Sequence, residues 1–304
     1  MMTALRQWAV SYDARTPWIG AGRTLIALGQ LSILLFASPS ALLVPVVGRP
    51  EPPYCDGVRS ISLYCRGDVG PETWHWLFIG VLLVVASGFA PRWTAIPHAW
   101  VAFSLNQSIA LPDGGESVAQ VVTLLLVPIC LLDDRTWHWF RPTRALRPVS
   151  RGITLSASLM IRLQMAAIYI NSGVAKLGTS AWVEGSAEYY IVRDKNFGAS
   201  GPVEPVILWI TASPLGTAAL TWGTIALECL LAILILGTSR MRMLALALGL
   251  LLHAAIIVTI GLWSFSFTMI GSLVLAVGIG TWTVSSETMP RWLRSRRTLA
   301  AVSE

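Results

Sequence analysis

The segment from Tyr169 to Tyr190 places a lysine, Lys176, at the end of a long apolar stretch, with Trp182, Glu184 and Glu188 following it. An ammonium group inside a bilayer costs about 2.5–3.5 kcal/mol at the centre of a helix. It therefore needs a carboxylate partner, an aqueous cavity or a chemical role. Lys176 is the first candidate for a functional residue.

Three roles remain open for Lys176. Burial disfavours the charged form of an amine, so a buried lysine can act as a general base. A lysine that keeps its charge can instead bind an anionic group of a substrate. If Glu184 or Glu188 lies beside it, the same charge forms a structural ion pair.

Two further ionisable side chains, Glu228 and His253, interrupt later apolar stretches. Polar residues often join membrane helices through hydrogen bonds. The alternative is a site that both residues share with Lys176. Because Lys176 is near the outer end of its stretch and the other two are nearer the middle of theirs, we expect some distance between them.

The stretch that ends at Lys176 carries a polar stripe. A period of about 3.6 residues places these residues on one helical face: Arg162, Ala166, Tyr169, Gly173 and Lys176. Gln164 and Asn171 lie on an adjacent face. A span with so many polar groups inserts poorly alone, so we expect it to be the central helix and to line an interior cavity.

The composition surrounding this stretch indicates an all-α integral membrane protein. The chain has 304 residues, of which 54% are hydrophobic and only 12% charged, and its mean hydropathy is +0.63. Eight apolar stretches approach the length of a membrane span: 24–47, 74–90, 93–111, 117–132, 152–177, 216–237, 241–261 and 263–283. Residues 203–214 are too short to cross alone, so they form an amphipathic surface or re-entrant outer segment, or the first half of a long sixth span.

Arginine clusters predict the orientation of these spans. Arginines precede the first span or follow an even-numbered one: Arg6, Arg15, Arg23, Arg92, Arg135, Arg141, Arg144, Arg147, Arg151, Arg240, Arg242, Arg291, Arg294, Arg296 and Arg297. By the positive-inside rule both termini are cytoplasmic in a multi-pass protein of the cell membrane. The net charge of +6 then reflects topology and contact with anionic lipid, not nucleic acid. The two termini read as interfacial amphipathic segments.

Four cysteines divide by location. Cys55 and Cys65 flank a short segment of the first outer loop, where an oxidising compartment favours a disulfide between them. Cys130 and Cys229 lie in spans and read as small apolar residues. The spacing fits no zinc motif, so no metal site is expected.

The residues around Lys176 resemble a known family. The stretch GVAKLGTSAWVEGSAEYY is similar to the signature of the horizontally transferred transmembrane (HTTM) family, whose best-known enzyme is the vitamin K-dependent gamma-glutamyl carboxylase. Glu228, the segment HAAIIVTIGLWSFSFTMI and the loop DGGES also match the family pattern. The resemblance covers about residues 15–285 and implies a single membrane domain over 1–304.

The resemblance also implies roles. Lys176 matches the carboxylase lysine that acts as a base on reduced vitamin K, and we group it with His253 and Glu228 as catalytic candidates. The candidates for the substrate cavity are Arg162, Tyr169, Asn171, Trp182, Glu184 and Glu188. The cofactor stays open, and a quinone or vitamin K-like lipid-soluble cosubstrate is the candidate.

Within the family, length and context resemble the bacterial SdpB type, which serves production of a secreted peptide toxin. One hypothesis is an enzyme, carboxylase-like in its use of lysine, that modifies or helps mature a secreted peptide precursor at the outer face. It would work beside a small SdpA-like partner protein in a bacteriocin-type pathway. The alternative is a non-enzymatic membrane partner that binds, escorts or neutralises a toxic peptide. A transporter is the third reading, although no inverted pair of broken helices is visible.

Overall fold

The computed structural model describes residues 12–48, 51–66, 69–110 and 112–278. The described part is all-α and contains no strand, only an isolated bridge between Phe89 and Trp137. The longer helices are α2 (Pro17–Phe36), α4 (Pro71–Ser87), α5 (Pro91–Ser108), α6 (Gly115–Leu131), α7 (Pro148–Lys176), α11 (Pro214–Leu236), α12 (Ser239–Ile260) and α13 (Trp263–Gly278). The short ones are α3 (Pro39–Leu42), η1 (Gly57–Ile61), η2 (Leu63–Cys65), α8 (Ser180–Val183), α9 (Ala187–Ile191), η3 (Gly201–Val203) and α10 (Glu204–Ile210).

Each of the eight expected spans corresponds to one of the longer helices. Among the described residues, four helices are long and apolar enough to cross a membrane, namely α2, α7, α11 and α12. Helices α4, α6 and α13 are apolar but shorter. The amphipathic segments expected at the two ends of the chain fall in 1–11 and 279–304, outside the described residues.

The helix expected for the first span starts and ends earlier in the chain than predicted. It was expected over 24–47, whereas α2 begins at Pro17 and ends at Phe36. Proline is favoured at the first position of a helix. Arg23 therefore lies inside the helix, with 1% of its surface exposed, and not in the segment before it. Its guanidinium donates to the Thr94 carbonyl and, at 3.3 Å, to His98 Nδ1, so the buried cation joins α2 to α5.

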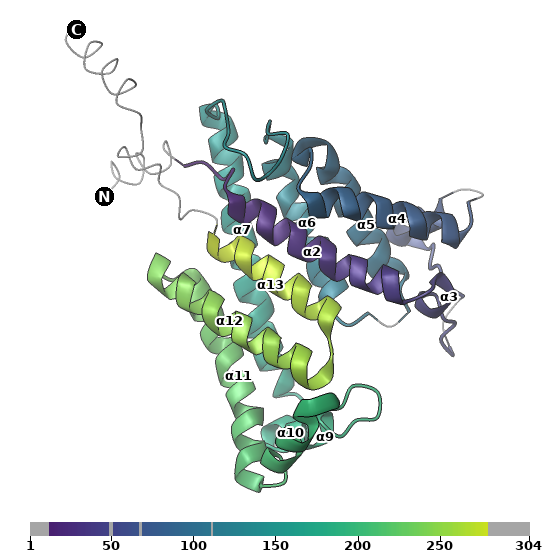
Figure 1. The fold of residues 1–304 in the computed structure, drawn as a ribbon, viewed down its shortest axis with the longest axis vertical. Coiled ribbons are helices and arrows are strands. Elements are labelled where there is room, and N and C mark those ends of the chain that lie inside the picture. The colour runs from purple at the N-terminus through teal and green to yellow at the C-terminus, as the bar shows by residue number, and fades with distance from the viewer. Residues whose placement is uncertain (1–11, 49–50, 67–68, 111, 279–304) are drawn as a thin grey trace, which may run out of the picture.

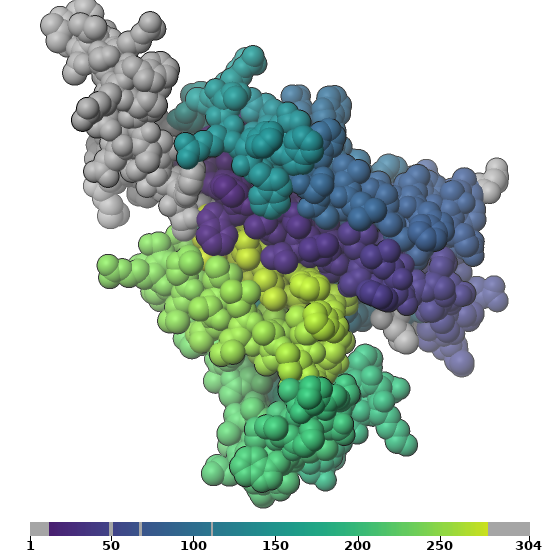
Figure 2. Space-filling view, viewed as in Figure 1, coloured from purple at the N-terminus to yellow at the C-terminus, as the bar shows by residue number. Residues whose placement is uncertain are grey.

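Helices α2 and α13 run side by side through the middle of the molecule (Figure 1). Glycine permits their close approach: a Cβ at Gly22 would lie 2.6 Å from the Gly271 carbonyl oxygen, and one at Gly271 would lie 2.6 Å from the Gly22 carbonyl oxygen. In the space-filling view, the yellow surface of α13 lies between purple α2 and light-green α12 (Figure 2). Helices α4 and α5 lie beyond α2 on the other side.

Helix α7 is not the most enclosed helix, contrary to the sequence-based expectation. In the most apolar 18-residue stretch of α2, 56% of the residues are buried, compared with 39% in the corresponding stretch of α7. One face of α7 is buried as predicted, including Ala166, Tyr169 and Gly173. Asn171 on the adjacent face is exposed, so only part of the polar surface of α7 packs inside the bundle.

The segment 203–214 is a separate element and not the first half of a long sixth span. Helix α10 ends at Ile210, and α11 starts at Pro214 after a break. The Ser213 side chain accepts a hydrogen bond from the backbone N–H of Gly216 and caps α11. Helices α9 and α10 lie beside the amino-terminal half of α11 at one end of the molecule (Figure 1), and Trp222 of α11 donates to the Val183 carbonyl oxygen of α8.

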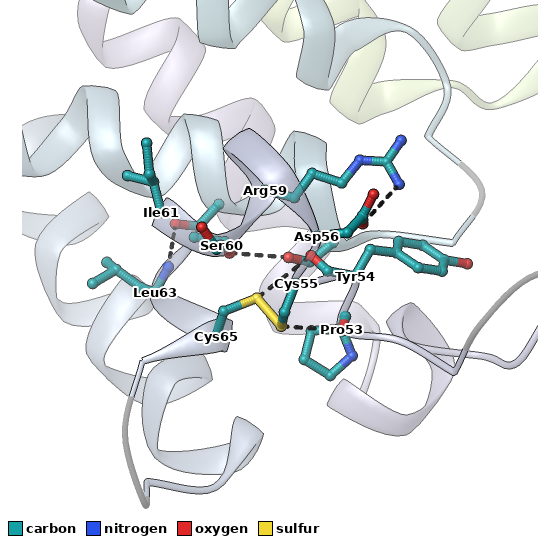
Figure 3. Close-up of a disulfide and its surroundings, with 12 residues drawn as sticks. Pro53, Tyr54, Cys55, Asp56, Arg59, Ser60, Ile61, Leu63 and Cys65 are labelled. Carbon is teal, nitrogen blue, oxygen red and sulfur yellow. Dashed lines mark hydrogen bonds and ion pairs between the residues drawn. A yellow bond between two sulfur atoms is a disulfide. The ribbon is translucent and has the colours of Figure 1, made fainter.

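The predicted disulfide is confirmed. Cys55 and Cys65 are bonded, with their Cα atoms 5.6 Å apart, and they close the loop that contains η1 and η2 (Figure 3). The loop also contacts the bundle, because Trp100 Nε1 of α5 donates to the Ile61 carbonyl oxygen at 2.9 Å. The disulfide loop is therefore held against α5.

Candidate functional site

Lys176 and Glu228 form an ion pair between α7 and α11. Lys176 Nζ lies 2.7 Å from Glu228 Oε2 and 2.8 Å from Glu228 Oε1. The two side chains are 20% and 11% exposed, so the pair is largely enclosed but still reachable from outside the helix packing. The expected separation of these two residues is wrong.

The pair forms because the two helices are offset along their axes. Lys176 is the last residue of α7, whereas Glu228 lies 14 residues after the start of α11, about 21 Å along it. Helix α11 thus extends well beyond the end of α7. A sequence gives the position of each residue within its own helix but not this offset, so the two depths could not be compared correctly.

Two small residues of α7 complete the contact. Ser172 Oγ donates to Glu228 Oε1 at 3.0 Å and accepts from Lys176 Nζ at 3.0 Å, so one hydroxyl contacts both charged groups. A Cβ at Gly173 would lie 3.0 Å from Cys229 Sγ, which shows how closely α7 and α11 approach here. Ser172 was not singled out from the sequence, although its i, i+4 spacing to Lys176 is a signal for such a contact.

Trp182 covers the ammonium group of Lys176. The nitrogen lies 5.2 Å from the centroid of the indole ring, within the range of a cation–π interaction. Trp222 of α11 fixes the segment that carries Trp182, since its Nε1 donates to the Trp182 carbonyl oxygen at 3.2 Å. The aromatic side chain predicted for this site is thus in contact with the lysine.

Glu184 and Glu188, the candidate partners for a structural ion pair, do not form ion pairs with Lys176. Glu184 is exposed. Glu188 is partly buried, and burial raises the pKa of its carboxyl group while the nearby charge of Lys176 opposes that rise. Glu188 is therefore a second acidic group close to the ion pair, not the lysine's direct partner.

Tyr169 and His253 form a buried hydrogen bond, with Tyr169 about two turns before Lys176 on α7. Tyr169 Oη and His253 Nε2 are 3.0 Å apart, and each residue is 1% exposed. A Cβ at Gly173, one turn along α7 from Tyr169, would lie 3.6 Å from Glu228 Cβ, so the Tyr169–His253 pair is close to the lysine site. His253 Nδ1 has no hydrogen-bond partner among the described residues. Side chains of α7, α11 and α12 therefore converge here.

Two of the predicted cavity residues lie elsewhere. Arg162 is 14 residues before Lys176, about 21 Å away along α7, and its Nε donates to the Ala276 carbonyl oxygen of α13. Asn171 is on the exposed surface of α7. The residues brought together are therefore Lys176, Glu228 and Trp182, with Tyr169 and His253 nearby.

The arrangement suits proton transfer or the binding of a polar group. The lysine and glutamate can together accept one proton, either on the carboxylate directly or on the amine after its proton has moved to the carboxylate. Lys176 can also donate a hydrogen bond to an oxygen atom of a ligand that replaces one of its contacts with Glu228. Within the described ranges, no cluster of three or more His, Cys, Asp or Glu side chains could hold a metal ion.

Comparison with known proteins gives two relatives from Bacillus subtilis (strain 168). The chain is 34% identical over 282 residues to the uncharacterized protein YitO, with 90% of both chains covered. It is 29% identical over 274 residues to the sporulation-delaying protein SdpB, covering 86% of this chain and 82% of SdpB. No family model matches the chain. No solved structure gives a significant match.

Proposed function

The chain belongs to the family of YitO and SdpB, and from this premise we propose that it modifies or helps mature a secreted peptide at the outer face of the cell membrane. The name of SdpB connects that relative with a sporulation-delaying system. The substrate proposed here is accordingly a toxin- or bacteriocin-type peptide precursor, with a small SdpA-like protein as a candidate partner.

We further propose that residues 1–304 form one multi-pass domain with eight spans and cytoplasmic termini. The arginine asymmetry supports this orientation. It places the Cys55–Cys65 disulfide and the lysine site toward the outside. Bonded cysteines are typical of an oxidising compartment, so the disulfide supports the same assignment.

The observation that carries the proposed function is the Lys176–Glu228 pair, because it is ionisable, internal and partly exposed. We propose that the pair is the proton-transfer centre of the reaction, with Glu228 taking the proton that Lys176 must release before its amine can act as a base. Trp182 and Ser172 then position the amine. Intramembrane ionisable residues commonly mark functional sites.

The resemblance to the HTTM family and its carboxylase adds a candidate cosubstrate, a quinone or vitamin K-like lipid. The described side chain that suits such a molecule is Lys176, whose ammonium group can donate to a ring oxygen in place of one of its two bonds to Glu228. When bound, the reduced molecule would supply an electron-rich phenol. The residues of this chain would hold its oxygen and accept its proton.

A second candidate function rests on the completeness of the same contact. Both carboxylate oxygens of Glu228 accept from Lys176. A purely structural role, in which the pair joins α7 to α11, is therefore sufficient to explain the contact. The protein would then be a non-enzymatic partner that binds, escorts or neutralises a toxic peptide.

Turnover separates the two functions: purified protein in lipid nanodiscs is incubated with the precursor, and the peptide mass is measured over time. A mass change in many peptide molecules per protein supports the enzyme, whereas stoichiometric binding without change supports the partner.

A further inference from the structure

A second concentration of charge lies in a pocket remote from Lys176. The pocket has a volume of about 450 Å³ and is formed where α6 ends, α5 begins and α7 begins. Its lining residues are Arg15, Arg92, Leu131, Leu132, Asp134, Arg144, Ala145, Leu146, Arg147 and Ser150. The connection between α6 and α7 and the amino end of α7 form the teal surface at the top of Figure 2.

One of the four arginines is already neutralised. Arg15 Nη1 lies 2.8 Å from Asp134 Oδ1, and Arg15 Nη2 lies 2.8 Å from Asp13 Oδ2 and also donates to the Arg144 carbonyl oxygen. This arginine with its two carboxylates carries a net charge of −1. Arg15 is thus a structural centre that holds the amino-terminal segment against the 134–144 region, and it does not attract a ligand.

The charges of the other three arginines are not offset by an ion pair within the described part of the chain. Arg92, Arg144 and Arg147 are exposed and form no ion pair with a carboxylate of the described residues. Adding their +3 to the −1 of the Arg15 group leaves a net charge of +2 around one pocket. Exposed arginines are often simply solvated, but these come from two separate segments of the chain and line the same concavity.

The remaining lining matches the rest of an anionic ligand. Ser150 supplies a hydroxyl donor. The amino end of α7 adds a dipole that favours an anion, and the side chain of its N-cap residue, Arg147, makes no capping hydrogen bond there. Three leucines, Leu131, Leu132 and Leu146, form an apolar part beside the charges. A pocket with basic and apolar parts fits an amphiphile with an anionic head.

We propose that this pocket is a specific binding site for a phosphate group, supplied by an acidic phospholipid headgroup or by free phosphate. Guanidinium groups bind phosphate oxygens through paired, charge-assisted hydrogen bonds. Arg92, Arg144 and Arg147 are the binding residues, and Ser150 is a further donor. This inference is independent of the reaction proposed for Lys176.

The test compares two triple variants of the full chain that lose the same charge. The pocket variant is Arg92→Gln/Arg144→Gln/Arg147→Gln. The control is Arg66→Gln/Arg141→Gln/Arg240→Gln, whose arginines are exposed and lie outside the pocket. Native mass spectrometry of the detergent-solubilised proteins measures binding of phosphatidylglycerol against phosphatidylcholine. Calorimetry with inorganic phosphate measures the free anion, and circular dichroism verifies that both variants are folded.

The pocket variant is expected to bind at least about tenfold more weakly than the parent, because the loss of even one hydrogen bond to a charged group is worth about a factor of ten. The control is expected to change affinity by less than about threefold. A pocket-dependent loss for phosphatidylglycerol identifies lipid as the source, and a pocket-dependent loss for inorganic phosphate identifies the free anion. Equal losses in both variants, or no binding of either probe by the parent protein, would overturn the proposal. If the pocket variant is unfolded, the single variants Arg92→Gln and Arg144→Gln replace it under the same criteria.

Discussion

Glu228 Oε2 lies 2.7 Å from Lys176 Nζ, and this contact joins the last residue of α7 to the middle of α11. Removing one partner leaves the other without its counter-charge, whereas replacing both removes the charge problem altogether. Substitutions at these two positions can therefore separate a structural pair from a chemical one.

The first prediction concerns Lys176→Gln, Glu228→Gln and their combination. If the pair is only structural, each single variant lowers the protein level, by up to about 3 kcal/mol of stability, and the double variant recovers much of it. If the pair is the proton-transfer centre, the double variant accumulates normally and has no maturation activity. Immunoblotting of membranes and mass spectrometry of the peptide provide the two readouts.

Lys176→Arg refines this result. Arginine keeps the positive charge but does not release a proton near neutrality. It should preserve a structural or anion-binding role and abolish a general-base role. Normal maturation by Lys176→Ala would remove Lys176 from the mechanism and leave the non-enzymatic function.

The second prediction concerns orientation. Trp182→Cys should react with a membrane-impermeant thiol reagent in intact cells, because the segment after Lys176 is expected outside. The parent background should first have Cys229 replaced by Ser, since Cys229 is free and only partly buried. A thiol that reacts only after lysis would contradict the orientation. Arg141→Cys is the matched cytoplasmic position and should show the reverse pattern.

The third prediction concerns the disulfide loop. Alkylation of fresh membranes without reduction should leave Cys55 and Cys65 unmodified, while Cys229 remains available. The bond closes a short loop, so Cys55→Ser with Cys65→Ser should reduce stability by about 2–3 kcal/mol at most. The thermal unfolding midpoint of the purified protein measures this change. Alkylation of both loop cysteines under the same conditions would show that the bond is absent in cells.

The fourth prediction concerns Asp133, in the connection after α6. Burial raises the pKa of its carboxyl group, but hydrogen bonds from His138 and Arg135 outweigh burial and lower the pKa to about 2. A carboxyl group with a lowered folded-state pKa stabilises the fold above its unfolded-state pKa of about 4 and loses that contribution as the pH falls through 2. Asp133→Asn should therefore cost about 2 kcal/mol at pH 7 and progressively less between about pH 4 and pH 2. Thermal unfolding of both proteins across this range measures the difference, and a gap that does not change with pH would exclude the linkage.

The sequence alone was enough to predict the all-α class and a helix at each of the eight apolar stretches, because both follow from local apolar length. It was also enough to predict the Cys55–Cys65 bond, since both cysteines lie in one short loop. A further local signal could have improved the boundaries. Five of the longer described helices begin at a proline: Pro17, Pro71, Pro91, Pro148 and Pro214. Proline is favoured at the first position of a helix, where its missing N–H costs nothing.

Only the tertiary structure decided which charged groups meet. Arg23 was expected in the segment before the first span, but it is buried inside α2, where its guanidinium contacts Thr94 and His98 of α5. An ion pair of Lys176 with Glu184 or Glu188 was one of three roles left open, and the offset between α7 and α11 brings Glu228 to the lysine. Helical periodicity determines which residues share a face of one helix. The relative shift of two packed helices depends on how their surfaces fit, as at Gly173 and Cys229, and that fit is a property of the assembled bundle.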